Sequence, residues 1–194
     1  LDLAGAAAYP TAWVHTPNTF YDPKRGARLY NRYLDELELG ETLGFDGIAV
    51  NEHHSTAYGM MPSPIVMASA LARRTTTAKI ATLAEEHSMI DNITEGRLIT
   101  GFVRGIGAEY HAWGSNPVFS HERFHEAHDL IIASWTRPGP FRWSSKHYHF
   151  EYVNLWPRPF QQPHPPIWVP SQGSGETIEW AAHPDRKYTY LQTF

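Results

Sequence analysis

The 194-residue chain contains no cysteine, which removes several kinds of chemistry at once. Without thiols there is no disulfide framework, no thiolate metal site and no cysteine nucleophile. The absence also suits a reducing compartment, and the opening stretch LDLAGAAAYP lacks the basic region with which a signal peptide begins. We therefore expect a cytoplasmic protein.

Long apolar runs and a strong charge of either sign are also absent. No apolar run approaches the roughly 18 residues of a membrane span, so no membrane association is expected. The net charge of -4 offers no basic surface to neutralise a row of phosphates, which argues against a nucleic-acid partner. Apolar residues make up 42% of the chain and charged residues 19%, as in folded globular proteins. The length suits a single domain, which we take to span residues 1–194.

Histidine is abundant, with 12 residues, and one stretch resembles a metal motif. The segment HERFH (121–125) matches the H-E-x-x-H pattern, in which two histidines one helical turn apart hold zinc and the glutamate is the general base. The longer form of this pattern fails, because His128 stands where it needs a glycine. A zinc hydrolase that uses His121, Glu122 and His125 remains an alternative to a simple helix-face role for these residues.

Helical and strand-like patterns alternate along the chain. The spacing of apolar residues predicts helices at 27–47 (ending near Gly44), 62–75, 85–96, 120–135 and 176–182, with Ser63 and Ser120 as N-caps. Short apolar runs predict strands at 47–50, 78–83, 97–103, 167–169 and 188–194, and the stretch 141–153 predicts a β-hairpin. This alternation indicates an α/β fold in which β-α units surround a parallel sheet.

Two places depart from that regular pattern. The strand at 78–83 runs into the following helix with no turn residues between Leu83 and Ala84, although such connections normally need a few. The last strand ends at Phe194 with no helix to cover it. We expect that residues are missing between Leu83 and Ala84 and after Phe194.

Polar and glycine-rich stretches follow three of the predicted strands. In parallel α/β folds, ligand-binding groups gather at the C-terminal ends of the strands. The three stretches are Asn51–His54, Arg104–Gly107 and Ser171–Thr177.

The stretch SQGSGET is a candidate phosphate site. Its glycines expose backbone N–H groups, Ser174 and Thr177 offer hydroxyls, and Arg104 on another strand end could supply a positive charge. The alternative is that Ser174 only caps its helix and the glycines only shape a turn. Gly105 and Gly107 lack the third glycine of a dinucleotide-binding fingerprint, which argues against that class of site.

The cluster Glu52-His53-His54 is a candidate for proton transfer. Adjacent residues at a strand end point in opposite directions, so at most one histidine needs to pack structurally. A histidine near pH 7 can move protons or stabilise an anionic intermediate. A metal site that recruits a distant residue such as His87 is the competing interpretation.

The sequence around these strand ends resembles that of the bacterial luciferase-like flavin-dependent monooxygenases. The matching stretches are LGFDGIAVNEHHSTAYGMMPSP, ALARRT with AKIATL, MIDNITEGRLITGFVRG, ERFHEAHDLI, and PPIWVP with ETIEWAA. They cover most of residues 27–194. The resemblance implies a (β/α)8 TIM-type barrel, incomplete in this chain because such a barrel needs about 250 residues. It also implies that flavin mononucleotide (FMN) is the cofactor.

The resemblance assigns roles to individual residues. His53, with Glu52 beside it, lies near the reactive edge of the flavin and assists formation or use of a peroxyflavin. The residues that it assigns to the flavin phosphate region are Arg104, Gly105, Ile106, Arg123, Gly173, Ser174 and Thr177.

The activity implied is oxidation of an apolar organic substrate by molecular oxygen. Tyr58, Met60 and Met61 are expected to line the substrate pocket. Reduced flavin would come from a separate flavin reductase or be formed in place by a nicotinamide, and relatives suggest a homodimer. A dehydrogenase of the same fold that uses the deazaflavin coenzyme remains an alternative.

Overall fold

A computed structural model describes residues 9–11, 16–53, 57, 59–82, 86–155 and 157–193, without the side chains of 79–82. The expectations for His54, Tyr58 and the junction between Leu83 and Ala84 lie outside these residues. Every predicted helix and strand has a counterpart among the described elements. The helices are α2 (Pro23–Thr42), α3 (Pro64–Arg74), α4 (His87–Ile93), α5 (Gly107–Ala112), α6 (Ser120–Thr136) and α7 (Gly175–Ala181), with 3-10 turns η1 (Asn18–Phe20) and η2 (Pro117–Phe119). The strands are β1 (Gly47–Ala49), β2 (Lys79–Thr82), β3 (Leu98–Gly101), β4 (Phe141–Ser144), β5 (His149–Val153), β6 (Ile167–Ser171) and β7 (Thr189–Gln192).

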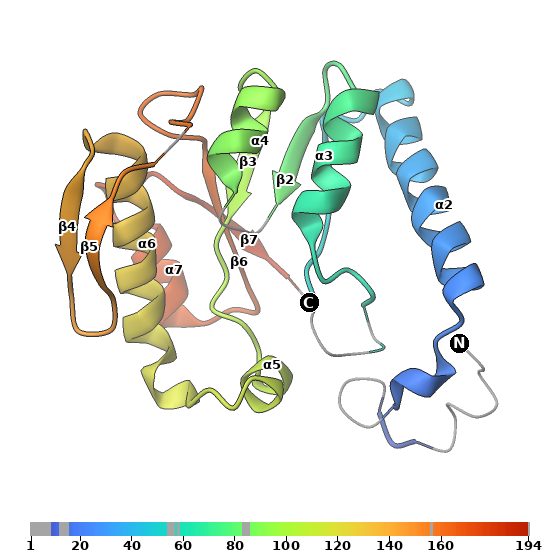
Figure 1. Ribbon diagram of the computed structural model, residues 1–194, viewed down its shortest axis with the longest axis horizontal. Coiled ribbons are helices and arrows are strands. Elements are labelled where there is room, and N and C mark those ends of the chain that lie inside the picture. The colour runs from blue at the N-terminus through green and yellow to red at the C-terminus, as the bar shows by residue number, and fades with distance from the viewer. Residues whose placement is uncertain are drawn as a thin grey trace.

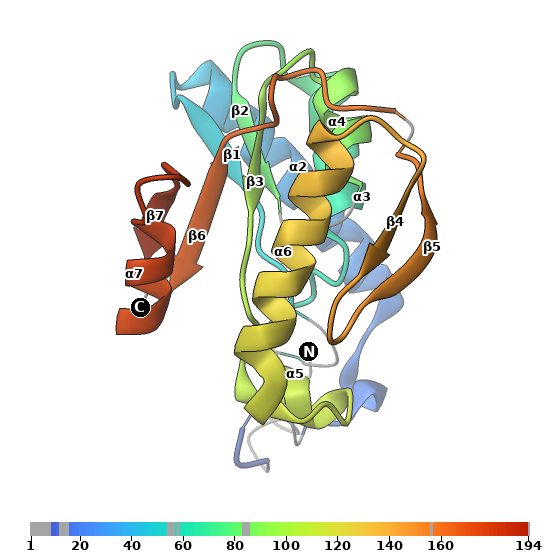
Figure 2. The ribbon, with the colours of Figure 1, turned by 90° about the vertical axis from the view of Figure 1, so that its left-hand side faces the viewer.

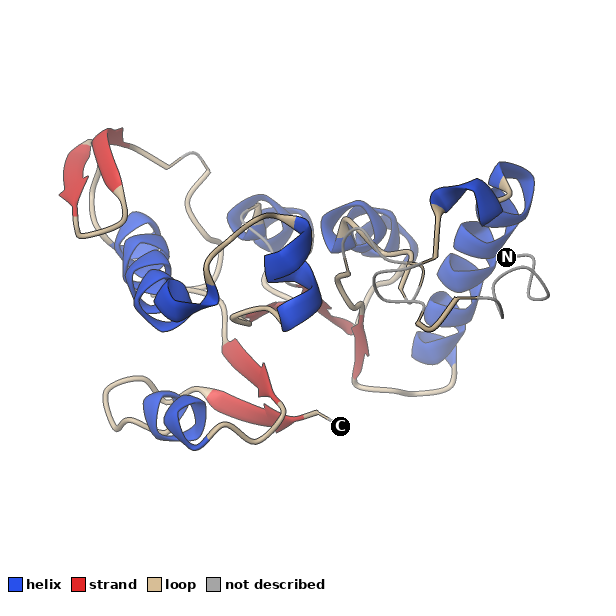
Figure 3. Cartoon of the chain, turned by 90° about the horizontal axis from the view of Figure 1, so that it is seen from below, coloured by secondary structure: helices blue, strands red, loops and turns tan. Residues whose placement is uncertain are grey.

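Five strands form one parallel sheet in the order β1-β2-β3-β6-β7, which confirms the predicted α/β class. The order follows the chain, so each β-α unit adds a strand beside the previous one. Seen from below, the strands lie on the inner side of a curved row of helices (Figure 3). The predicted hairpin is also confirmed: β4 and β5 pair antiparallel and lie beside α6, away from the sheet (Figure 1). Among the described residues, no helix is both long enough and apolar enough to cross a membrane.

The ends of α2 follow local sequence signals. Pro23 occupies the first turn, and the Asp22 carboxylate accepts hydrogen bonds from the backbone N–H groups of Lys24 (2.9 Å) and Arg25 (3.2 Å). The predicted stop at Gly44 is confirmed, because this residue adopts a φ of 86°, which glycine reaches without steric cost.

The predicted serine caps have different outcomes. Ser63 is the N-cap of α3, but its side chain makes no capping hydrogen bond. The prediction for Ser120 is wrong, because Ser120 already has helical angles (φ -64°, ψ -37°) and Phe119 is the N-cap. The 3-10 turn η2 runs directly into α6 and takes over the role of a cap. Ser174 is a true N-cap of α7, with its side chain accepting from the Thr177 N–H at 3.5 Å.

The apolar core consists of two clusters. The first packs α2 and α3 against β1, with Leu71 completely buried. The second packs α6 and α7 against β3 and β6, and its largest member is Trp135, which is 1% exposed. In the side view, α6 runs along the sheet between β3 and the hairpin (Figure 2). The strand pairing β1-β2-β3-β6 between the two clusters brings the C-terminal ends of β1, β3 and β6 to one edge of the sheet.

Glu41, in the last turn of α2, ties this helix to the segment that leads into β2. Its carboxylate accepts hydrogen bonds from the backbone N–H groups of Thr76, Thr77 and Ala78, the last at 2.7 Å. The backbone donors at Ala78 and Thr77 lower the pKa of Glu41 to about 2.

Candidate functional site

A cavity of about 760 Å³ lies at the C-terminal ends of β1, β3 and β6. Its volume is in the range of small-molecule and cofactor sites. The three polar strand ends meet there, as expected for a parallel sheet. The predicted site residues that line it are Glu52, His53, Arg104, Gly105, Ile106, Ser174 and Thr177.

Two predicted residues do not line this cavity. Gly173 forms the turn before the Ser174 cap, where its φ of 95° favours glycine. Arg123 is exposed on α6 and lines a second cavity of about 490 Å³, bounded by β3, α5 and α6. Glu52, Arg104 and Gly105 line both cavities.

His53 is held where β1 leads into the cavity. Its backbone N–H donates to the Met61 carbonyl at 3.1 Å. Its Nδ1 lies 4.0 Å from Oε1 of Glu109 on α5, and the other oxygen of Glu109 accepts from the Ile106 N–H at 3.0 Å. The sequence did not indicate Glu109, because the six-residue helix α5 that carries it was not predicted.

Gly105 makes the close approach of Glu109 possible. Its φ is 90°, and a Cβ at this position would lie 3.2 Å from Oε2 of Glu109. The Tyr110 hydroxyl donates to the Arg104 carbonyl at 2.5 Å, which fixes the same turn. These contacts hold the turn after β3, which carries Arg104, against Glu109 and Tyr110 on α5.

Arg104 is half-buried in the cavity wall and forms a charged cluster with α6 and α7. Its guanidinium contacts Nε2 of His121 on α6. This histidine nitrogen also lies 3.1 Å from Oε2 of Glu176 on α7. Ser174 and Thr177, on the same α7 segment as Glu176, also line the cavity. The residue that α6 contributes to this cluster is thus His121 and not Arg123.

The remaining histidines on this side of α6 pack against aromatic rings. His125 stacks on Trp180 of α7, with centroids 5.2 Å apart and the planes 7° from parallel. Burial lowers the pKa of His125, and the nearby His121 adds to the effect. His128 is buried, and its Nε2 lies 2.5 Å from the Tyr188 hydroxyl.

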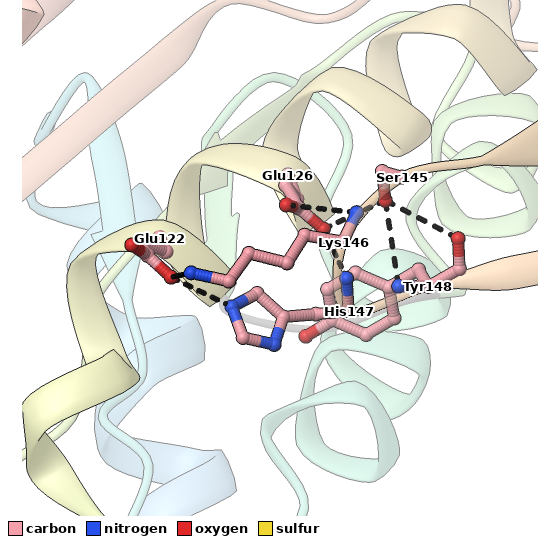
Figure 4. Close-up of polar contacts among 6 residues, drawn as sticks. All are labelled: Glu122, Glu126, Ser145, Lys146, His147 and Tyr148. Carbon is pink, nitrogen blue, oxygen red and sulfur yellow. Dashed lines mark hydrogen bonds and ion pairs between the residues drawn. The ribbon is translucent and has the colours of Figure 1, made fainter.

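Glu122, the general base of the zinc motif, is engaged elsewhere. Its carboxylate accepts from Lys146 Nζ at 2.6 Å and lies 2.9 Å from His147 Nε2, on the hairpin turn (Figure 4). The hydrogen bond from Lys146 is the main cause of its lowered pKa. One turn further, Glu126 accepts from the Ser145 hydroxyl and from the His147 N–H. Both glutamates therefore hold the β4–β5 hairpin against α6.

The structure does not bring together the side chains that the zinc-hydrolase alternative requires. His121 turns toward Arg104 and Glu176, whereas Glu122 turns toward the hairpin. Within the described part of the chain, no three histidine, aspartate or glutamate side chains converge as a set of metal ligands. The residues of the H-E-x-x-H motif have other contacts: His125 packs against Trp180, and Glu122 holds the hairpin.

Comparison with known proteins identifies the family. A family model described as luciferase-like monooxygenase matches residues 12–184. The chain belongs to the luciferase-like monooxygenase family. Among its relatives is the oxygenase component of the flavin-dependent trigonelline monooxygenase of Acinetobacter baylyi, which is 28% identical over 76% of this chain and 45% of that protein. Another is the alkanal monooxygenase alpha chain of Photorhabdus luminescens, 27% identical over 84% of this chain and 49% of that protein.

Solved structures of monooxygenases share the fold. The oxygenating constituent of 3,6-diketocamphane monooxygenase from Pseudomonas putida, determined in complex with FMN, aligns with a TM-score of 0.75 at 19% identity. The alignment covers 90% of this luciferase-like chain and 54% of that one. The chain spans about half the length of the curated relatives that it matches.

Proposed function

We propose that the protein is a flavin-dependent monooxygenase that binds FMN in the 760 Å³ cavity and oxidises an apolar organic substrate with molecular oxygen. The observation that carries this proposal is the meeting of two groups of residues in one cavity. Arg104 and His121, with the hydroxyls of Ser174 and Thr177, suit an anionic phosphate, and His53 stands in the same cavity beside Glu109. We also propose that the five-stranded sheet is part of a (β/α)8 barrel.

The phosphate would be bound by side chains from three segments: the end of β3, the helix α6 and the start of α7. Arg104 supplies the full charge and a forked set of donors, and His121 adds a ring nitrogen from α6. Ser174 and Thr177 supply hydroxyl donors. The Glu176 carboxylate now lies 3.1 Å from Nε2 of His121, but its side chain is 71% exposed, so it can turn to solvent when a phosphate takes its place. Arg123 lies outside this set.

The walls of the cavity suit the apolar part of a flavin. Ile99, Phe124, Trp168 and Trp180 line it and would shield a bound ring system from water. When bound and reduced, FMN would supply the activation of molecular oxygen. The protein would supply the binding site, the orientation of the substrate and a dry environment.

His53 would be the residue that exchanges a proton. The Glu109 carboxylate, whose Oε1 lies 4.0 Å from Nδ1, would pair with the ring when the ring takes up a proton. The other ring nitrogen can then accept or donate a proton toward a bound substrate. Glu52, at the end of the same strand and half-buried, adds negative charge to the cavity wall.

A separate flavin reductase is the proposed partner. Support comes from the trigonelline enzyme, whose name describes it as the oxygenase component of a larger system. We further propose a homodimer, as the family resemblance implies.

The proposal predicts that binding and turnover depend on different residues. Arg104→Met should weaken FMN binding by about ten- to a hundredfold, the usual cost of losing a charged hydrogen bond, and leave riboflavin binding unchanged. His53→Gln should keep the FMN dissociation constant within about twofold and slow turnover by about a hundredfold. Binding is measured by flavin fluorescence. Turnover is measured as product formation from an aliphatic aldehyde with reduced FMN and oxygen.

Two outcomes contradict these assignments. The first is an equal loss of FMN and riboflavin affinity in Arg104→Met, since riboflavin has no phosphate. The second is loss of FMN affinity, rather than of turnover, in His53→Gln. Oxygen-independent hydride transfer from a substrate to the oxidised deazaflavin coenzyme, and no reaction with reduced FMN, would favour the dehydrogenase alternative.

A further inference from the structure

The segment Gly59–Met61 lies directly against His53 and is anchored to the body of the protein. The Met61 carbonyl accepts the His53 backbone N–H at 3.1 Å, and Met61 is part of the first core cluster. The Met60 carbonyl accepts the hydroxyl of Tyr30, on α2, at 2.5 Å. Both anchors hold the segment in place independently of any ligand.

Gly59 is the point at which this segment meets the His53 ring. A Cβ at Gly59 would lie 2.5 Å from Cδ2 of His53 and 3.1 Å from its Cβ and Cγ. What excludes a side chain is the ring itself.

A side chain at Gly59 would fit only if the His53 ring moved. Non-bonded carbon atoms normally stay about 3.5–4.0 Å apart, so an alanine would displace the His53 ring edge by about 1 Å. The segment cannot easily yield instead, because Tyr30 and the core hold it at Met60 and Met61. Such a shift would change the 4.0 Å separation between His53 and Glu109.

We propose that Gly59, Met60 and Tyr30 form a support that fixes the orientation of the His53 ring toward Glu109, with Gly59 as a positioning residue. The support acts on the histidine in the flavin-free protein. Only its effect on turnover rests on the proposed function of the cavity.

The structural part is tested by NMR of the FMN-free protein, with the ring signals of His53 assigned from the spectrum of His53→Gln. In the wild type, Hδ2 of His53 should show a cross-peak to the Gly59 Hα protons. In Gly59→Ala the His53 ring signals should move while those of the other histidines stay. The control is Gly40→Ala on α2, where the nearest atom to the new Cβ is Ile48 Cγ1 at 4.0 Å, and it should leave all of these signals unchanged.

A second variant keeps the test decisive if Gly59→Ala does not fold. Tyr30→Phe retains the ring but loses the hydrogen bond to Met60, so the segment should loosen and the His53 signals should shift or broaden. Unchanged His53 signals in the folded variants would overturn the proposal, as would the absence of the Hδ2–Gly59 cross-peak in the wild type.

The catalytic part is tested by separating binding from turnover. In Gly59→Ala, turnover should fall by about a hundredfold, the usual effect of a 1 Å displacement, with the FMN dissociation constant within about twofold. Wild-type turnover in Gly59→Ala, together with displaced His53 signals, would overturn this consequence. If His53→Gln itself retains full turnover, the proposed role of His53 fails, whereas the NMR result still decides whether the support exists.

Discussion

His87 is a buried histidine that the proposed reaction does not use. It is 2% exposed on α4, and its ring lies 5.9 Å from that of Trp135 and 6.2 Å from that of Phe102. Burial penalises the charged form and lowers the pKa of His87 to about 4, so the ring is neutral at pH 7. In the unfolded chain the same ring protonates near pH 6.5, so the unfolded state binds more protons between pH 6.5 and 4.

The consequence is a loss of stability in acid. The full stability is present above pH 6.5 and declines as the pH falls through this window to about 4. Replacing His87 with phenylalanine should therefore flatten the dependence of the melting temperature on pH between 6.5 and 4. The measurement is thermal unfolding at pH 7.0, 5.5 and 4.5. His111→Gln, at an exposed position on α5, is the control and should retain the wild-type slope, and an equally steep slope in His87→Phe would refute the explanation.

Single residues of the candidate site could be predicted from the sequence where they follow a strand. His53, Arg104, Ser174 and Thr177 share one cavity because the ends of parallel strands meet at one edge of the sheet. Glu109 could not be found in this way, since its place depends on how α5 turns after β3.

His121 and Arg123 line different cavities because they lie on different faces of α6. Residues two apart on an α-helix point about 200° away from each other, so one residue facing the first cavity excludes the other. His121 and His125 line the first cavity and Arg123 the second, as this spacing requires. Sequence similarity alone does not fix that phase, because it depends on how α6 packs against β3.

At the level of elements, the junction of α2 and β2 depends on one carboxylate. The backbone N–H groups at Thr77 and Ala78 lower the pKa of Glu41 from 4.5 to about 2, so the native state holds the charged form more strongly than the unfolded state does. The stabilisation is present above pH 4.5 and is lost as the pH falls through about 2.

A comparison of variants isolates this contribution. The free energy of unfolding of Glu41→Gln should be lower than that of the wild type at pH 7, and the difference should shrink as the pH falls from 4.5 toward 2. Urea unfolding at several pH values measures it. Glu36→Gln, on the same helix but hydrogen-bonded to the exposed Arg32 side chain, is the matched control. A difference between Glu41→Gln and the wild type that does not vary with pH would contradict the assignment.

The elements that the sequence predicted were those with clear apolar periodicity and clear terminal residues. Helix α5 was missed because six residues give too short a pattern to recognise. The cap at Ser120 was misplaced because the 3-10 turn at Pro117–Phe119 continues smoothly into α6. The contacts of Glu122 and Glu126 with the hairpin could not be predicted, since they join residues about 20 positions apart across two different elements.

At the scale of the whole molecule, sheet order and family agree. The order β1-β2-β3-β6-β7 with helices on its outer side is what successive β-α units produce, and the family model covers residues 12–184. The sheet brings three strand ends, from residues more than 100 positions apart in the chain, to a single cavity. We propose one place in this cavity for an anionic group and one for proton transfer, and the proposed function depends on the first.

The most direct test is an anaerobic titration of the wild-type protein with FMN and with riboflavin, in oxidised and in reduced form, followed by flavin absorption and fluorescence. Since the cluster of Arg104, His121, Ser174 and Thr177 would contact only the phosphate, we expect saturable FMN binding that is at least about tenfold tighter than riboflavin binding. Equal affinity for the two flavins, or no change in the flavin band with either, would contradict it.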